Sequence, residues 1–227
     1  MTRVVGLLGG VGPGSTAAFY LEVVRRYGQR HGGDEPALLI YSVPLAASIE
    51  AAILGGQTNG PQVEQLKGLL EGGVAALARA GADAIAMPCN TLQAWLPAIV
   101  ARSGLPYLAL IGETVRYARR AGYQRVALVC TEAMRLMGLY QAELEAQSVP
   151  YLLPGEADQA AITQAILASL HGQPDANAPL LPVLRRLEND ADALLLGCSD
   201  LHSFTTPLPV VDAMQVLAEA TVEYLEL

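Results

Sequence analysis

The sequence predicts an α/β protein made of two pseudo-symmetric, three-layer α/β domains with parallel sheets. Two observations favour this fold class. Short β-rich runs alternate with amphipathic helical patterns along the 227 residues, which is typical of parallel α/β proteins. One eleven-residue segment also recurs 109 positions later with the same cysteine in it, which indicates two related halves.

The predicted strands are mostly near-continuous apolar runs, as expected for strands that helices cover on both faces. The first run is short and passes directly into glycines, so it is interpreted as a strand and not as a signal peptide. In chain order the predicted strands are 3–8, 37–43, 83–87, 107–110, 125–130, 193–196 and 210–211.

Helices are predicted between these strands from their apolar spacing. The segment 61–80 places its apolar residues on one stripe, with Pro61 in a first turn where proline is tolerated. Asp212 is expected to cap a last helix. The segment 172–182 contains a glycine, three prolines, an aspartate and an asparagine, and is therefore predicted to be a surface loop.

The internal repeat is the most informative feature of the chain. Segments 82–92 and 191–201 are identical at five of eleven positions, and the shared residues include Cys89 and Cys198. We therefore expect two related domains with an active-site cleft between them. The first comprises 1–110 plus 212–227 and carries Cys89, whereas the second comprises 111–211 and carries Cys198.

The two cysteines form a candidate acid–base pair. Each follows a short buried strand, at the edge where ligands bind in parallel α/β sheets, and we expect a helix to begin there. A helix N-terminus would favour a thiolate and would also bind a carboxylate. Two thiols flanking one carbon suit inversion, since one removes a proton and the other donates a proton to the opposite face. Asn90, Thr91 and Ser199 are candidate donors to the carbanion-like transition state.

The competing interpretation is simple packing, since free cysteine is among the most buried residue types. Matched positions in a repeat weaken that interpretation for Cys89 and Cys198, although duplication alone can preserve a packing residue. Cys130 also ends a predicted strand, but its counterpart in the repeat is Gly9, so Cys130 is expected to be structural or pocket-lining.

The glycine-rich loop 9–16 does not fit a nucleotide site. A phosphate-binding P-loop would need a lysine where Ser15 stands, although Gly9 and Gly14 have the right spacing. A dinucleotide fingerprint would need a third glycine at the same position. It would also need an acidic residue after the run 40–43, which has none.

The same loop can instead cradle a small carboxylate through its backbone N–H groups. Gly10, Gly12 and Ser15 are the candidate binding residues. The alternative is a tight turn in which Ser15 or Thr16 caps the following helix.

Composition limits the partners. Net charge is −8 and there is no basic run, so nucleic acid and anionic membranes are not expected to bind. The three cysteines lack CxxC spacing, which argues against a zinc ribbon and a disulfide framework. No apolar run is long enough to span a membrane, and a cytoplasmic location is expected.

These motifs together resemble the aspartate/glutamate/hydantoin racemase family, in particular its aspartate racemase-like branch. The resembling segments, in the expected order, are 9–16, 88–91, 197–201 and 211–213. The resemblance implies a cofactor-independent and metal-free amino-acid racemase with an interdomain active site, commonly a homodimer. The implied partner is a small-molecule substrate, either an amino acid or another carboxylate.

Residue by residue, the resemblance matches Cys89 and Cys198 to the two catalytic cysteines of the family. Asn90, Thr91 and Thr131 match positions near the α-carboxylate or amino group of the substrate. Asp200 matches an acidic position beside the second cysteine. We therefore predict that Gly10, Gly12, Ser15, Asn90, Thr91, Thr131, Ser199 and Asp200 bind substrate.

The sequence also departs from the family pattern. An arginine that usually follows the second strand is absent from the segment 44–50, so an amino acid less acidic than aspartate is a candidate substrate, unless Arg116 or Arg135 supplies the cation. After Cys-Asn-Thr the family often shows Ala-His, whereas this chain has Leu92 and Gln93.

Two other readings remain open at this stage. A related isomerase or decarboxylase of small carboxylates would need one cysteine and not both. A non-catalytic ligand-binding protein on the same scaffold would need neither.

Overall fold

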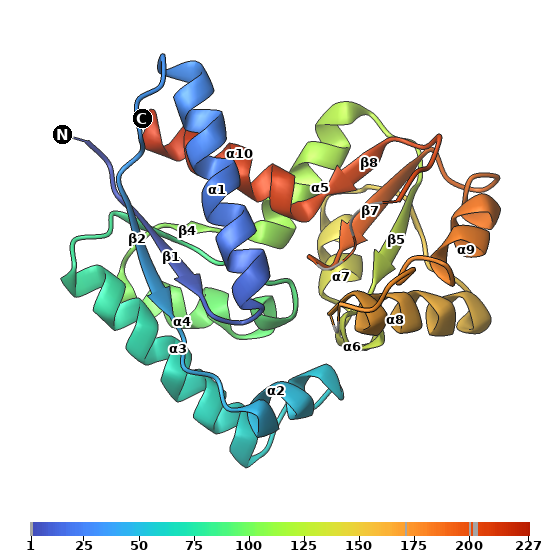
Figure 1. The fold of residues 1–227 in the computed structure, drawn as a ribbon, viewed down its shortest axis with the longest axis horizontal. Coiled ribbons are helices and arrows are strands. Elements are labelled where there is room, and N and C mark those ends of the chain that lie inside the picture. The colour runs from blue at the N-terminus through green and yellow to red at the C-terminus, as the bar shows by residue number, and fades with distance from the viewer. Residues whose placement is uncertain (1, 171, 200, 202–203) are drawn as a thin grey trace. The chain divides into compact units, whose positions relative to one another are not determined.

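The computed structural model describes residues 2–170, 172–199, 201 and 204–227, and the chain divides into two compact units (Figure 1). Unit 1 comprises Met1–Glu113 and Met214–Leu227, and unit 2 comprises Thr114–Ala213. Each unit holds a four-stranded, all-parallel sheet between helices, which confirms the predicted fold class.

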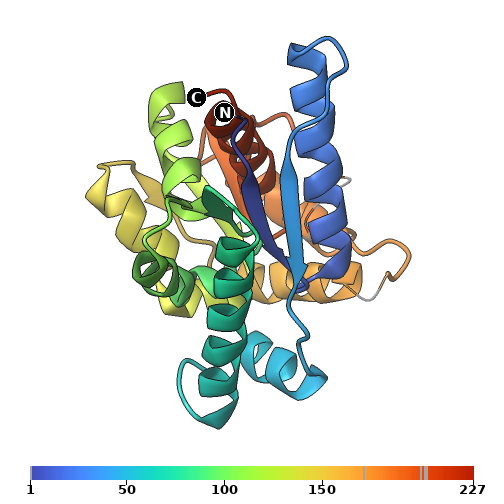
Figure 2. The ribbon, with the colours of Figure 1, turned by 90° about the vertical axis from the view of Figure 1, so that its left-hand side faces the viewer.

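The sheet of unit 1 has the strand order β2-β1-β3-β4. Its strands are β1 (Val5–Gly9), β2 (Leu38–Ser42), β3 (Ala84–Ala86) and β4 (Tyr107–Leu108). The central strands β1 and β3 are fully buried, as their continuous apolar sequence predicts. Figure 2 shows β1 beside β2 in this unit, with both termini of the chain at one end.

Helices cover both faces of this sheet. The helices of unit 1 are α1 (Pro13–Arg30), α2 (Ala47–Leu54), α3 (Pro61–Arg79), the 3₁₀ helix η1 (Thr91–Ala94), α4 (Leu96–Ser103) and α10 (Ala213–Leu225). Leu8 points to the face that α3 covers, because a Cβ on Gly73 of α3 would lie 2.5 Å from a Leu8 methyl. Val5 and Leu7 alternate to the other face and are also fully buried.

The sheet of unit 2 repeats this topology with the order β6-β5-β7-β8. Its strands are β5 (Val126–Cys130), β6 (Tyr151–Leu152), β7 (Ala193–Gly197) and β8 (Val210–Asp212). The registers match as well. β3 pairs Ile85 with Tyr107 of β4, and β7 pairs Leu194 with Val210 of β8.

The helices of unit 2 are α5 (Leu110–Ala121), whose first turn belongs to unit 1, α6 (Glu132–Met137), α7 (Leu139–Ala146), α8 (Glu156–Leu170) and α9 (Leu180–Leu187). Alternate residues of β5 and β7, such as Val129 and Leu196, pack in one cluster with α8 and α9. On the opposite face, Tyr140 of α7 contacts the end of β7, since its ring lies 2.9 Å from the Cβ position of Gly197.

Some predicted bounds were wrong. Strand β6 was not predicted, because two residues are too short to show a period. The predicted loop 172–182 ends early, since α9 begins at Leu180 and accommodates Pro182 in its first turn. Leu110 was assigned to a strand but begins α5.

Candidate active site

Cys89 lies three residues beyond β3, at the carboxyl edge of the unit 1 sheet. Its N–H donates to the carbonyl of Met87 at 2.9 Å, which makes a tight turn around the buried Pro88. Cys89 is half-buried and packs against the main core of unit 1. The thiol therefore sits on a constrained turn and retains partial exposure to solvent.

The α-helix that was expected to begin directly after Cys89 is not present there. Asn90 leads into the single 3₁₀ turn η1, and the α-helix α4 starts only at Leu96. After β7, the described residues up to β8 are not helical. For Cys89, stabilisation of the thiolate by an adjacent α-helix N-terminus was therefore a wrong expectation, because a single 3₁₀ turn follows it.

Gln93 is a residue of this site that sequence reasoning missed. It lies in η1, is 6% exposed, and donates from Nε2 to the Cys89 carbonyl at 2.9 Å and to the Met87 carbonyl at 3.4 Å. The Tyr107 hydroxyl of β4 donates to its Oε1. The sequence signal that could have identified Gln93 was its departure from the histidine that the family often has at this position.

Two predicted binding residues flank Cys89. Asn90 is buried and 4% exposed, and Thr91 is half-buried at the start of η1. Both lie at the same sheet edge as the glycine loop, because β1 and β3 are paired neighbours. Unit 1 thus brings its predicted residues together at one edge.

The glycine loop is closed on itself by a side chain. The Thr16 hydroxyl accepts from the Gly10 N–H at 3.2 Å and donates to the Gly12 carbonyl at 3.2 Å. The Gly10 N–H is therefore already engaged. A Cβ on Gly10 would lie 2.6 Å from the backbone of Val43, so close packing requires glycine there. Gly12, with φ +72°, and the half-buried Ser15 stand at the start of α1.

Cys198 directly follows β7, at the carboxyl edge of the unit 2 sheet. It is half-buried and packs against the cluster formed with α8 and α9. Ser199 follows and is half-buried, and the Leu201 N–H donates to the Cys198 carbonyl at 3.4 Å. Asp200 lies outside the described residues.

Cys130 and Thr131 end the neighbouring strand β5. Cys130 is 1% exposed, and burial raises the pKa of its thiol to about 12, with Glu132 raising it further and Arg135 opposing. Such a thiol stays protonated near neutral pH. Thr131 caps α6 through its hydroxyl, which accepts from the Met134 N–H at 3.2 Å.

Arg135 does not present a free cation to a substrate carboxylate. Its guanidinium makes two hydrogen bonds to the carboxylate of Glu132, at 2.6 and 2.7 Å, in the paired geometry that arginine favours. The other arginine considered, Arg116, lies on α5 and is half-buried.

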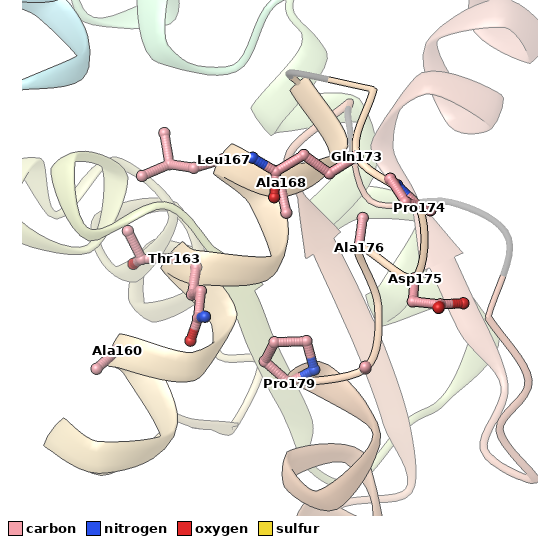
Figure 3. Close-up of a pocket in the computed structure, with 11 residues that line it drawn as sticks. Ala160, Thr163, Leu167, Ala168, Gln173, Pro174, Asp175, Ala176 and Pro179 are labelled. Carbon is pink, nitrogen blue, oxygen red and sulfur yellow. The ribbon is translucent and has the colours of Figure 1, made fainter.

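A pocket of about 580 Å³ lies elsewhere in unit 2, between α8 and the loop before α9 (Figure 3). Thr163, Gln173 and Asp175 are among the residues that line it, and the described candidate residues are not. Across the described ranges, no three His, Cys, Asp or Glu side chains gather as metal ligands would. No helix in that part of the chain is long and apolar enough to cross a membrane.

Comparison with known proteins places the chain in a family. The family described as Asp/Glu/Hydantoin racemase matches residues 8–221. The Broad specificity amino-acid racemase RacX of Bacillus subtilis (strain 168) is 27% identical over 229 aligned positions, which cover 96% of both chains.

Solved structures share the fold. The aspartate racemase of Picrophilus torridus superposes with a TM-score of 0.79 at 24% identity, covering 99% of this chain and 94% of the other. An aspartate racemase homologue from Pyrococcus horikoshii OT3 also gives 0.79, at 19% identity over the full length of both chains. Together with the match over residues 8–221, these findings show that the chain belongs to the Asp/Glu/hydantoin racemase family.

Proposed function

We propose that this protein is a cofactor-independent amino-acid racemase that inverts Cα with Cys89 and Cys198 as its two bases. The observation that carries the proposal is the equivalence of the two cysteines. Ala86 of β3 and Leu195 of β7 occupy equivalent positions, because each is the second residue of its strand to pair with the next strand, β4 or β8. Cys89 and Cys198 each lie three residues beyond that position. Two half-buried thiols thus occupy the same place in two copies of one topology.

The proposed reaction needs one thiolate and one thiol at opposite faces of the same Cα. The thiolate takes the Cα proton, and the electron pair stays on carbon as a carbanion-like species. The thiol then gives its proton to the other face. The two cysteines exchange protonation states in each turnover, so a proton must return before the next turnover in the same direction. Acid–base action of this kind supplies about 10²–10⁴-fold in rate.

Preorganised donors must supply most of the remaining rate by stabilising the developing charge. Gly12, Ser15, Asn90 and Thr91 at the edge of unit 1 are the proposed donors, together with Ser199 in unit 2. Gly10 is proposed to shape the loop and not to donate, because Thr16 engages its N–H. Thr131 is likewise proposed to act through its position, since its hydroxyl caps α6.

We further propose that the substrate side chain is uncharged. The relevant segments are the loops after β1, β2, β3, β5 and β6 together with the first turn of each following helix. Among the described residues of these segments, Arg135 is the one lysine or arginine. Its guanidinium is paired with the Glu132 carboxylate. An anionic side chain would need an available cation when it is desolvated. The relative described as a broad specificity racemase supports this proposal.

The test is α-proton exchange in D₂O, followed by NMR under reducing conditions with a panel of L- and D-amino acids. We expect deuterium incorporation with loss of optical purity in the wild-type protein, and no loss of optical purity in Cys89→Ser or in Cys198→Ser. Cys130→Ala is the matched control and should retain exchange, because the Cys130 thiol is buried and protonated. Loss of optical purity retained in both serine variants would refute the two-base proposal, whereas exchange without inversion is compatible with it, because the remaining cysteine can take and return a proton on its own face.

The other outcomes separate the remaining readings. Turnover that needs one cysteine only would favour a related isomerase or decarboxylase. Binding without exchange by the wild-type protein would favour a ligand-binding homologue.

A further inference from the structure

A largely buried series of side-chain hydrogen bonds connects β4 to the turn that carries Cys89. The Tyr107 hydroxyl donates to Gln93 Oε1, and Gln93 Nε2 donates to the carbonyls of Cys89 and Met87. Gln93 is 6% exposed, and Tyr107 packs against the core of unit 1. These contacts join residues 14 positions apart in sequence through a single amide group.

The orientation of that amide follows from its partners. The Met87 and Cys89 carbonyls can only accept, so the NH₂ group of Gln93 must face them. Its oxygen then faces Tyr107, whose hydroxyl must donate. The reverse orientation would place three oxygen acceptors together. The Gln93 amide, the Tyr107 hydroxyl and the two backbone carbonyls therefore have one consistent assignment of donors and acceptors.

Both peptide groups beside the Cys89 Cα are held in this way. The N–H of Cys89 is bound to the Met87 carbonyl at 2.9 Å, and the Cys89 carbonyl is bound by Gln93 at 2.9 Å. With the peptide on each side held, the direction of the Cα–Cβ bond is set. A shift of about 1 Å in a reacting group can cost about 10²-fold in rate, so this constraint matters for proton transfer.

We propose that Gln93 and Tyr107 are positioning residues that hold the Cys89 turn in the geometry that proton transfer requires. This inference rests on the proposed function of Cys89. It gives a role to the residue at position 93, where this chain departs from the family histidine.

Electrostatics are compatible with this role. Burial raises the pKa of Tyr107 above its usual range, the hydrogen bond to Gln93 opposes that rise, and the negative charge of an ionised Cys89 adds to it. The Tyr107 hydroxyl therefore remains protonated and continues to donate when Cys89 is a thiolate. Its proton keeps the Gln93 amide in place in both states of the thiol.

The tyrosine of this arrangement has no counterpart at the equivalent described strand position of unit 2. The position equivalent to Tyr107 in unit 2 is Val210, which pairs with Leu194 as Tyr107 pairs with Ile85. A valine side chain cannot donate a hydrogen bond. Cys198 therefore serves as an internal control in any measurement on Cys89.

The experiment compares Tyr107→Phe and Gln93→Leu with the wild-type protein. The first readout is the rate of iodoacetamide alkylation at each cysteine, followed by peptide mass spectrometry from pH 6 to 10. Tyr151→Phe and Gln159→Leu are the matched controls. Tyr151 donates to Glu145 at the surface, and the buried Gln159 donates to the Cys130 carbonyl at 2.9 Å.

We expect Cys89 to be alkylated roughly threefold faster or more in both test variants, because the released turn exposes the thiol, while the rate at Cys198 is unchanged. The controls should leave the Cys89 rate unaltered. The second readout is racemisation, in which kcat should fall roughly tenfold in the test variants with KM nearly unchanged. Gln93→His, which keeps one donor and one acceptor, should restore much of the loss.

The outcomes separate this inference from the proposed function. Alkylation needs no substrate, so it reports on the Cys89 turn even if the wild-type protein racemises no amino acid. In that case the proposed function is refuted, while the alkylation result still tests how the turn is held. If the wild-type protein racemises an amino acid and folded Tyr107→Phe leaves both the Cys89 rate and kcat unchanged, the positioning role is overturned. Equal acceleration at all three cysteines would show general destabilisation and would also overturn it.

Discussion

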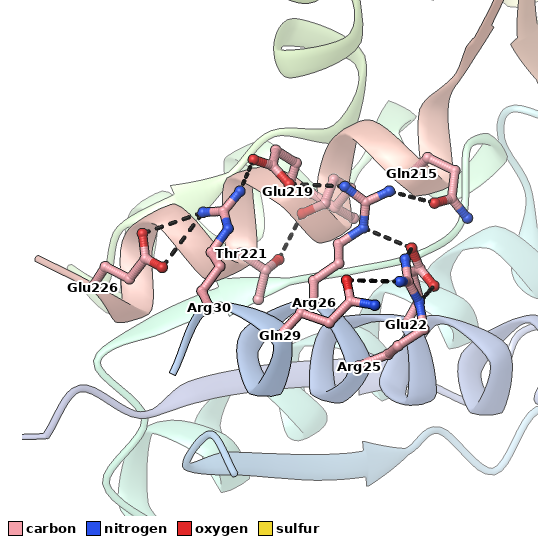
Figure 4. A network of polar contacts seen from close by, with 10 residues as sticks. Glu22, Arg25, Arg26, Gln29, Arg30, Gln215, Glu219, Thr221 and Glu226 are labelled. Atoms are coloured by element: carbon pink, nitrogen blue, oxygen red, sulfur yellow. Dashed lines mark hydrogen bonds and ion pairs between the residues drawn. The ribbon is translucent and has the colours of Figure 1, made fainter. Parts of the chain in front are cut away.

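Glu219→Gln should loosen the C-terminal helix α10 from α1. Within unit 1 the Glu219 carboxylate accepts from Arg26 at 2.8 Å and also from Arg30, and it links residues almost 200 positions apart in sequence (Figure 4). Burial raises the pKa of Glu219, but its hydrogen bonds to Arg26 and Arg30 outweigh burial, and the net pKa is lowered. The carboxylate is therefore bound as an anion.

The magnitude follows from exposure. Exposed ion pairs contribute about 0.2–1 kcal/mol each, so two pairs give at most about 2 kcal/mol. The Glu219 side chain is 34% exposed, and both arginines keep other carboxylate partners, Glu22 for Arg26 and Glu226 for Arg30. We therefore expect a loss of about 1 kcal/mol in the local stability of α10.

Amide hydrogen exchange of α10 peptides, read by mass spectrometry at neutral pH and low salt, is the assay. A loss of about 1 kcal/mol corresponds to about fivefold faster exchange in α10. Because the folded pKa of Glu219 is lowered, its contribution is present above the unfolded pKa and disappears as the pH falls through the folded one. Salt at 1 M should reduce the difference between the two proteins. Unchanged exchange in α10 at low salt would refute the reasoning.

Four further expectations concern Gly10, Cys130 and the side chain of the substrate. Gly10→Ala should lower the free energy of unfolding by about 3 kcal/mol in urea unfolding, because the new Cβ would meet the Val43 backbone at 2.6 Å and the φ of Gly10 is +93°. Gly14→Ala is the control and should be neutral or slightly stabilising, since the space around its new Cβ is open. Cys130 should be alkylated far more slowly than Cys89 in the native protein at pH 8, since its pKa is raised to about 12, and comparable rates would contradict its burial. Because the folded pKa of Cys130 exceeds its ordinary value near 9, stability should fall as pH rises from about 9 towards 12, and Cys130→Ala should remove that part of the slope in urea unfolding. Amino acids with uncharged side chains should exchange their α-proton faster than aspartate, and the reverse order in the NMR assay would refute the substrate proposal.

Much of the fold could be predicted because local sequence patterns indicate the strands and helices. The apolar runs at β1, β5 and β7 were long enough to identify, whereas the two residues of β6 were not. The one-turn η1 after Cys89 was also beyond prediction, because the order of small polar residues there suits a 3₁₀ turn and an α-helix N-terminus equally well.

Side-chain partners were harder to predict than positions. Residue type alone predicts that the glycine loop is not a nucleotide-binding loop, and only the structure shows the Thr16 hydroxyl accepting from the Gly10 N–H. Thr131 was matched to a substrate-binding position, and the structure shows its hydroxyl capping α6. In each case one hydroxyl can serve several donors or acceptors, and sequence does not say which lies nearest.

The sequence by itself therefore determined the α/β class, the two-fold repeat, and the place of Cys89 and Cys198 at strand ends, because each is written in local composition or in a direct repeat. The tertiary structure alone decided the strand order and the contact of Tyr107 with Gln93, which joins β4 to η1. Hydrogen bonds between side chains far apart in sequence depend on how strands pair and helices pack. No local sequence pattern indicates that two such side chains will be in contact.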